Sequence, residues 1–305
     1  MLREALQKWR ENYYVSKALV SVSRPVYKVA ALFSTQIPRK IKNNGVTIIL
    51  PNGRKLHFVR DLGIHMASSL YWHGLDGYEP ATSRTLRFLF ERVSIFVDVG
   101  ANIGLYSLIA GLTNPKIHVM AFEPEPRLYK GLVENVKLNR LESQISTYQI
   151  ALSNQTGKAE FYLPPTPGRD VESTGTIAID SWQKRKEHTT LQVDTLRFDE
   201  FQFARPERIE LMKIDVEDTE ASVLCGMSKT ILRDKPIIVC EILPRPHKNQ
   251  QTLNIIRDLA YTPYWITSEG YIRVTDFDFP RKSHQDFLLS PRSGPAIADD
   301  LTSVI

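Results

Sequence analysis

The most informative segment of the sequence is VDVGANIGLYS, at residues 97–107. It continues a short apolar run that begins at Ser94, and its last residues open a helical pattern. Gly100 and Gly104 allow a sharp backbone turn and the close approach of a ligand, and Asn102 tolerates unusual dihedral angles. The segment therefore predicts a ligand-binding loop at the carboxyl end of a buried strand.

This loop differs from the dinucleotide-binding fingerprint. A G-x-G-x-x-G motif that starts at Gly100 would need glycine at the positions that hold Asn102 and Leu105. A pyrophosphate also prefers a helix N-terminus without a nearby carboxylate, whereas Asp98 stands at the entrance of this loop. A carboxylate suits a ligand with a positive ammonium group, such as the methionine part of S-adenosyl-L-methionine.

A second acidic residue follows the next apolar run. Glu123 comes directly after His118–Phe122, about 20 residues beyond the loop. An acid at this place can accept hydrogen bonds from both hydroxyls of a ribose. Because NAD-binding proteins share the feature, it favours an adenosine ligand without identifying which one.

The surrounding segments alternate between strand and helix patterns. We expect strands at Ser94–Val99, His118–Phe122, Ser146–Leu152, Ile209–Val216 and Pro236–Ile242, and helices at Glu79–Phe90, Gly104–Gly111, Arg127–Asn139 and Glu217–Leu232. Such alternation predicts an α/β fold whose largely parallel sheet is covered by helices on both faces. Further upstream, Val46–Leu50 and Lys55–Val59 flank a Pro-Asn-Gly turn and predict a β-hairpin.

The charge of this 305-residue chain is unevenly distributed. Its net charge is +5, and the first 42 residues hold nine basic and two acidic residues. The excess therefore belongs to an N-terminal arm, so we expect no nucleic acid partner for the core. Two interpretations of the arm remain open: a helical extension that packs on the core, or a basic helix in peripheral contact with an acidic membrane. Cys225 and Cys240 make no disulfide framework, which favours a reducing, cytoplasmic location.

From about Tyr78 to Ile242 the chain resembles the FkbM family of methyltransferases. The segments that carry the resemblance are YE at 78–79, FVDVGANIG at 96–104, AFEP at 121–124, NV at 135–136, LN at 138–139, ALS at 151–153, LMKIDVE at 211–217 and VCEI at 239–242. The resemblance implies a Rossmann-like class I methyltransferase fold with a mostly parallel seven-stranded sheet. It also implies S-adenosyl-L-methionine as cofactor and O-methylation, often of sugar hydroxyls.

The resemblance also suggests domain limits and one departure. We expect a basic helical arm and hairpin at 1–77, the methyltransferase domain at 78–290 and a C-terminal tail at 291–305. The family usually has glycine where Asp218 stands, and we expect Asp218 to cap the following helix instead.

Strand-end placement and the resemblance together give a candidate cofactor site. Its expected members are Glu79, Asp98, Gly100, Asn102, Gly104, Glu123, Ala151 and Asp215. Glu123 would hold the ribose, and Ala151 would lie near the adenine. The methionine end would be lined by Asp98, Gly100, Asn102 and Gly104. Glu79 would reach the ammonium group, or else be an exposed acid at a helix start.

The expected catalytic residues are Asp215, Glu241 and His73. Asp215 follows the fourth strand, where the transferred methyl group should lie, and would orient the acceptor hydroxyl or take its proton. His73 is a second candidate base, and a structural or exposed histidine is its alternative. Glu217 and Glu241 stand at neighbouring strand ends; paired carboxylates there could hold a divalent metal, but we expect none.

The acceptor is expected to be a sugar, a glycan or another small molecule. An irregular segment at 164–175 would face it, and Trp182 would stack on a sugar ring. Two other functions remain open. One is a module that binds S-adenosyl-L-methionine without catalysis, and the other, which the sequence favours less, is an NAD-dependent oxidoreductase.

Overall fold

A computed structural model describes residues 45–59, 66, 69–70, 73–163, 175–178, 188–202, 208–243, 246–275 and 285–292. The chain divides into a smaller unit, Met1–Pro80 with Thr166–Glu172, and a larger unit, Ala81–Pro165 with Ser173–Ile305. The basic arm and the tail from residue 293 lie outside the described residues. The domain limits expected from the sequence stay a prediction.

The described part of the smaller unit contains the expected hairpin. β1 (Val46–Ile49) pairs antiparallel with β2 (Lys55–Phe58) across the Pro-Asn-Gly turn. Residues of β1 alternate between buried and exposed, as a strand with one covered face requires. A short 3-10 helix, η1 (Gly74–Gly77), follows.

The larger unit is built on an eight-stranded sheet in the part of the chain that the structure describes, in the order β12-β11-β13-β10-β9-β3-β4-β5. The strands are β3 (Ile95–Val99), β4 (His118–Phe122), β5 (Ile145–Tyr148), β9 (Leu211–Ile214), β10 (Ile237–Glu241), β11 (Tyr261–Thr267), β12 (Gly270–Arg273) and β13 (Asp286–Pro291). The neighbours from β10 to β5 are parallel, and β13, β11 and β12 pair antiparallel. The Rossmann-like fold expected from the sequence is confirmed; β12, joined to β11 by a tight turn, adds a strand to the expected seven.

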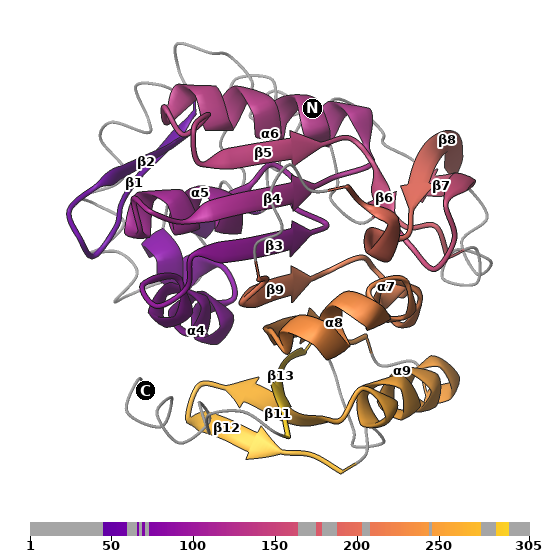
Figure 1. Cartoon of the computed structure of the whole chain (residues 1–305). Helices are drawn as coiled ribbons and strands as arrows, with labels where there is room; N and C mark the ends of the chain where they lie inside the picture. Colours follow the sequence, from indigo (N-terminus) through magenta and orange to yellow (C-terminus); the bar gives the residue numbers. More distant parts are fainter. Residues whose placement is uncertain are drawn as a thin grey trace, which may run out of the picture. The chain divides into compact units, whose positions relative to one another are not determined.

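The strand order reverses between β3 and β9. The chain runs outward from β3 through β4 to β5, and it later returns to β9 on the other side of β3 before continuing to β10. Figure 1 shows this order from magenta β5, through β3 and β9, to yellow β12. Ligands of such sheets bind at the carboxyl ends of the strands beside this reversal.

Helices cover the sheet, and its central strands are buried and largely apolar. Every residue of β3, β9 and β10 is buried, as expected for parallel strands that are covered on both faces. The described helices are α4 (Pro80–Phe90), α5 (Leu105–Thr113), α6 (Pro126–Leu138), α7 (Glu220–Gly226), α8 (Ser228–Asp234) and α9 (Pro246–Asp258). α5 has eight buried residues.

Two segments differ from their expected form. The strand expected at Ser146–Leu152 is divided: β5 belongs to the large sheet, while β6 (Ala151–Leu152) joins a second sheet of order β6-β8-β7. In that sheet β8 (Thr189–Leu196) pairs parallel with β6 and antiparallel with β7 (Gly157–Leu163). The helix expected at Glu217–Leu232 is also divided, since α7 ends at Gly226 and α8 begins at Ser228. An apolar pattern does not reveal which strand will be the hydrogen-bonding partner.

Both cysteines are free thiols, and Cys240 is buried in β10. Among the helices in the described ranges, none has the length and apolar composition needed to span a bilayer. The expected location and membrane contact stay predictions.

Candidate functional site

The loop after β3 has the backbone that its glycines suggested. Gly100, Asn102 and Gly104 have φ values of 79°, 54° and 92°, all in the left-handed region. A Cβ atom on Gly100 would lie 1.8 Å from the carbonyl oxygen of Asp215, which follows β9. Glycine is therefore required at residue 100 for its conformation and for the close contact between the two strand ends.

Glu123 ties this loop to the end of β4. Its Oε2 atom accepts a hydrogen bond from the backbone N–H of Asn102 at 2.9 Å, and its Oε1 atom accepts one from Glu125 N–H at 2.9 Å. Burial raises the pKa of Glu123 to about 8. Because each carboxylate oxygen has two lone pairs, the pair of oxygens can still accept ribose hydroxyls. The structure thus brings Glu123 and the loop together, as the sequence predicted.

Asp98 points into the protein interior. Its side chain is buried, and its Oδ2 atom accepts a hydrogen bond from Ser107 Oγ at 2.5 Å in the first turn of α5. Burial raises its pKa, while the nearby charge of Lys213 opposes that rise. The structure gives Asp98 a role in joining β3 to α5, and its expected contact with an ammonium group stays a prediction.

Lys213 is a site residue that the sequence reasoning missed. It lies in β9 with only 4% of its side chain exposed, and its Nζ atom is 2.6 Å from Oδ2 of Asp215. The same nitrogen lies 4.9 Å from the centre of the Tyr106 ring. The sequence did carry a signal, because a lysine inside the apolar run LMKI must be buried or break the strand.

Three carboxylates meet at the ends of β9 and β10. Oxygen atoms of Asp215, Glu217 and Glu241 all lie within 4.8 Å of one another. Burial and then the charge of Asp215 raise the pKa of Glu217 to about 8 and that of Glu241 well above its usual range. Asp215 is paired with Lys213, and burial beside Asp215 favours the protonated form of Glu241. Three such oxygens could also hold a hard divalent cation.

Asp218 does not cap α7, contrary to expectation. Glu217 and Asp218 both have positive φ, 54° and 83°, so the helix begins later and Thr219 occupies the N-cap position. The Asp218 N–H donates a hydrogen bond to Oε1 of Glu220 at 3.2 Å. Asp218 thus adopts the backbone conformation that glycine would adopt without strain.

Three further predicted residues are His73, Glu79 and Ala151. His73 and Glu79 belong to the smaller unit, where His73 is exposed and its Nδ1 atom lies 3.3 Å from Ser69 O. Glu79 has a φ of 41° and directly precedes α4. Ala151 is buried at the start of β6. Trp182 and most of the expected substrate segment, residues 164–174, lie outside the described residues.

A cavity of about 350 Å³ lies in the larger unit near the start of α7. Its lining residues are Ser153, Asn154, Ile177, Ala178, Asp218, Thr219, Glu220, Ala221, Ser222, Ile242, Leu243, Asn249, Gln251 and Thr252. They follow β6 and β10, lie between β7 and β8, or belong to the segment before α7, to α7 itself and to α9. The sequence reasoning did not anticipate this cavity, since α9 lay outside its assigned elements.

Comparison with known proteins identifies the family. Residues 98–272, more than half of the chain, match the model of the methyltransferase FkbM domain. The chain belongs to this family. The FkbM match includes the loop after β3, Glu123 and the three carboxylates. The class I methyltransferase fold that the resemblance implied is confirmed.

Several FkbM relatives carry functional names. The chain is 32% identical over 155 residues to methyltransferase sdnD of Sordaria araneosa, covering 44% of this chain and 60% of that protein. It is 28% identical over 158 residues to hexuronic acid methyltransferase AglP of Haloferax volcanii, covering 50% and 59%. It is 25% identical over 174 residues to 2-O-methyltransferase NoeI of Sinorhizobium fredii, covering 54% and 70%. The match thus spans about 60% of the length of the first two of these relatives.

A solved structure is similar over much of the chain. The crystal structure of methyltransferase FkbM from Methylobacillus flagellatus KT aligns with a TM-score of 0.45 and 16% identity, covering 74% of this chain and 54% of that chain.

Proposed function

We propose that this chain is an S-adenosyl-L-methionine-dependent O-methyltransferase that acts on a hydroxyl of a sugar, a glycan or another small molecule. The observation that carries the proposal is the contact at the strand reversal. There the left-handed loop at Gly100 abuts the backbone of Asp215, and Glu123 binds the same loop. Membership of the FkbM family and the names of its O-methylating relatives support the reaction type.

The cofactor would be held by residues of the loop and of β4. Gly100, Asn102 and Gly104 would surround its methionine end, and Glu123 would accept its ribose hydroxyls. The open lone pairs of Glu123 and the absence of a Cβ at Gly100 fit such a ligand. When bound, S-adenosyl-L-methionine supplies a methyl group that is activated by a positive sulfur.

Asp215 is the best candidate to handle the acceptor proton. Its carboxylate is fixed by Lys213 at 2.6 Å and is half-buried. It would accept a hydrogen bond from the acceptor hydroxyl and take the proton when the oxygen forms its new bond to carbon. A positioned base typically contributes ~10²–10⁴-fold, and alignment of the reactants contributes more. Glu241 lies next to Asp215 and would influence how readily Asp215 takes up a proton. His73 is the alternative candidate for the base.

Calorimetric titration tests the cofactor. We expect S-adenosyl-L-methionine and S-adenosylhomocysteine to bind, NAD not to bind, and Glu123→Gln to weaken both sulfur ligands by about tenfold or more, because one amide oxygen replaces two acceptors. A folded protein that binds neither sulfur ligand would contradict the proposal, and NAD binding would favour an oxidoreductase.

Methyl transfer from labelled cofactor to a panel of sugars, glycans and small alcohols tests the reaction. Transfer that is lost in Asp215→Asn while cofactor affinity persists would support the assigned base. Tight cofactor binding with no transfer to any acceptor would favour the non-catalytic module.

A further inference from the structure

The cavity beside α7 is separate from the residues assigned to the cofactor. None of its described lining residues belongs to the loop after β3 or to β4. It lies instead on the side of the strand reversal where β10 ends, with Ile242 and Leu243 in its wall. Glu220 links it to the proposed base, since this residue lines the cavity and the nearby charge of Asp215 contributes to its raised pKa.

The wall of the cavity is rich in hydrogen-bonding groups. Hydroxyl and amide side chains come from Ser153, Asn154, Thr219, Ser222, Asn249, Gln251 and Thr252. Such groups donate to and accept from hydroxyls. Among the lining residues within the described ranges there is no lysine, arginine or histidine, and the acidic side chains are those of Asp218 and Glu220. This part of the wall is therefore suited to a neutral hydroxyl-rich ligand, and the charge of Asp218 disfavours an anion.

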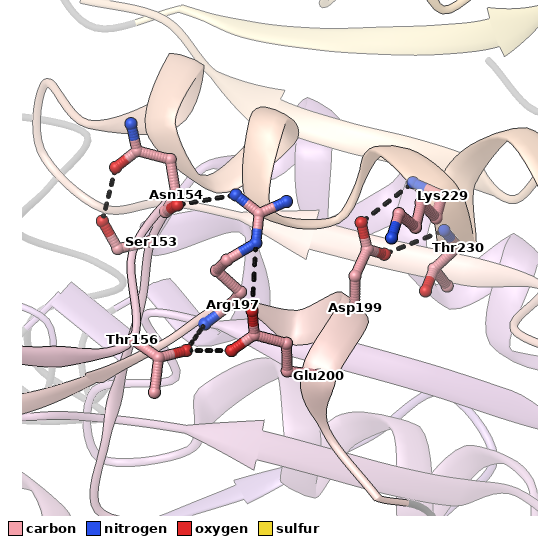
Figure 2. Close-up of polar contacts among 8 residues, drawn as sticks. All are labelled: Ser153, Asn154, Thr156, Arg197, Asp199, Glu200, Lys229 and Thr230. Carbon is pink, nitrogen blue, oxygen red and sulfur yellow. Dashed lines mark hydrogen bonds and ion pairs between the residues drawn. The ribbon is translucent and has the colours of Figure 1, made fainter.

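One side of the wall is held firmly by a polar network. Arg197 donates a hydrogen bond from Nη1 to the carbonyl oxygen of Asn154 at 2.6 Å, and its Nε atom lies 3.5 Å from Glu200. Figure 2 shows these contacts together with Thr156, which donates a hydrogen bond to Glu200. The backbone position of Asn154 is thus fixed from the turn after β8.

Further polar contacts join the turn after β8 to α8. Asp199 accepts hydrogen bonds from the backbone N–H groups of Lys229 and Thr230 at 3.0 and 2.9 Å, in the first turn of α8 (Figure 2). A Cβ atom on Gly226 of α7 would lie 1.9 Å from Ser153 O, so α7 packs directly on this wall. A preformed wall of this kind reduces the entropy that ligand binding must overcome.

We infer that this cavity is the acceptor subsite and that it selects neutral, hydroxyl-rich groups over acidic ones. The inference rests on the proposed function and adds its substrate class and location. Asn154, Asn249 and Thr252 are the residues that would bind the hydroxyls, because they line the cavity from two separate segments and carry amide or hydroxyl groups. A hexuronic acid, the acceptor in the name of one relative, would meet the acidic side chain of Asp218 here, next to Glu220, whose pKa is raised to about 8 by burial.

A matched pair of probes tests this inference. Methyl α-D-glucopyranoside and methyl α-D-glucopyranosiduronate share one ring and differ in a carboxylate. They are titrated into the full chain with S-adenosylhomocysteine present, and backbone amide shifts are followed by NMR. We expect the neutral probe to shift amides of residues 219–222 and 249–252, and the uronate to bind at least ~10-fold more weakly, a difference of ~1.4 kcal/mol.

A charge variant and its control sharpen the test. Gln251 is an exposed lining residue of α9, whereas its exposed neighbour Gln250 does not line the cavity and bonds to Asn254 instead. Gln251→Lys should reduce the preference for the neutral probe several-fold, and Gln250→Lys should leave it unchanged.

The possible outcomes separate the two proposals. Equal or tighter binding of the uronate, shifts confined to other residues, or no binding of either probe would overturn the acceptor subsite. Failure of the proposed function is seen separately, as absent binding of S-adenosyl-L-methionine in calorimetry, and it does not depend on either glucoside.

Discussion

The Lys213 ammonium nitrogen lies 2.6 Å from a carboxylate oxygen of Asp215, in a strand where only 4% of the lysine side chain is exposed. The pair joins the interior of β9 to the site at its carboxyl end. It also places a positive charge beside the cluster that Asp215 forms with Glu217 and Glu241. The predictions below follow from this pair and from its surroundings.

Lys213→Met should be strongly destabilising. It leaves the Asp215 charge without its partner, and breaking a buried pair in this way typically costs about 3–5 kcal/mol. Lys158→Met is the control, because Lys158 and Asp194 form a pair of similar length, 2.7 Å, with 70% and 60% of their side chains exposed. That change should cost less than ~1 kcal/mol. Equal losses in urea unfolding would show that the Lys213 pair has no special role.

Gly100→Ala should abolish cofactor binding. The added Cβ atom would meet Asp215 O at 1.8 Å and separate the two strand ends that form the loop. Gly53→Ala is the control. Gly53 has nearly the same φ as Gly100, +80° against +79°, but no atom lies within 4 Å of the Cβ atom that alanine would add. Gly53→Ala should therefore cost only the ~1–2 kcal/mol of a left-handed alanine. Calorimetry with S-adenosylhomocysteine checks both variants, and unchanged affinity in Gly100→Ala would refute the assigned loop.

Substitutions at residue 218 should invert the usual order of stability. In most structured segments an alanine variant is more stable than a glycine variant. Asp218, however, has a φ of 83°, a conformation in which alanine is strained and glycine is not. Asp218→Gly should therefore be more stable than Asp218→Ala by about 1 kcal/mol. Thermal unfolding of the two variants measures the difference. A more stable alanine variant would mean that this backbone is not left-handed in solution.

Without cofactor, stability should fall as the pH rises from ~5 to ~8. Burial, followed by the charges of Asp218 and Asp215, raises the pKa of Glu220 to about 8, whereas its unfolded value is near 4.3. The folded state thus binds the extra proton in this window, so raising the pH favours unfolding by up to ~1.4 kcal/mol per pH unit from one carboxyl. Above the pKa that Glu220 has in the folded protein, this carboxyl no longer makes stability depend on pH.

Glu220→Gln should flatten this pH dependence, since glutamine carries no proton to lose. Glu134→Gln is the control, because Glu134 is an exposed helix residue and its replacement should leave the slope unchanged. Urea midpoints measured across the pH window give the slopes. Identical slopes for wild type and Glu220→Gln would rule out a raised pKa at this carboxyl.

Chelators should leave methyl transfer unchanged. Lys213 lies 2.6 Å from Asp215 and supplies a positive charge, and burial raises the pKa of Glu241 well above its usual range, so the cluster has less negative charge for a cation to balance. Dialysis against EDTA followed by a transfer assay checks this. Loss of activity that Mg²⁺ or Ca²⁺ restores would make the three carboxylates a metal site.

The sequence by itself determined the local features of this protein. Glycines at residues 100 and 104 predicted the loop, because few other residues adopt a positive φ without strain. Apolar runs predicted the central strands, and their alternation with helical patterns predicted a parallel sheet. Glu123 lies beside the loop because both follow neighbouring strands, whose carboxyl ends meet at one edge of the sheet, and its contact with a ribose stays a prediction.

Only the tertiary structure decided which distant groups meet. It turned Asp98 toward Ser107, paired Lys213 with Asp215, and brought Glu241 from β10 to the end of β9. It also brought α9 to the cavity, far along the chain from Asn154. Periodicity fixes which face of a strand or helix is apolar, but the partner of each buried polar group depends on strand order and packing between segments remote in sequence.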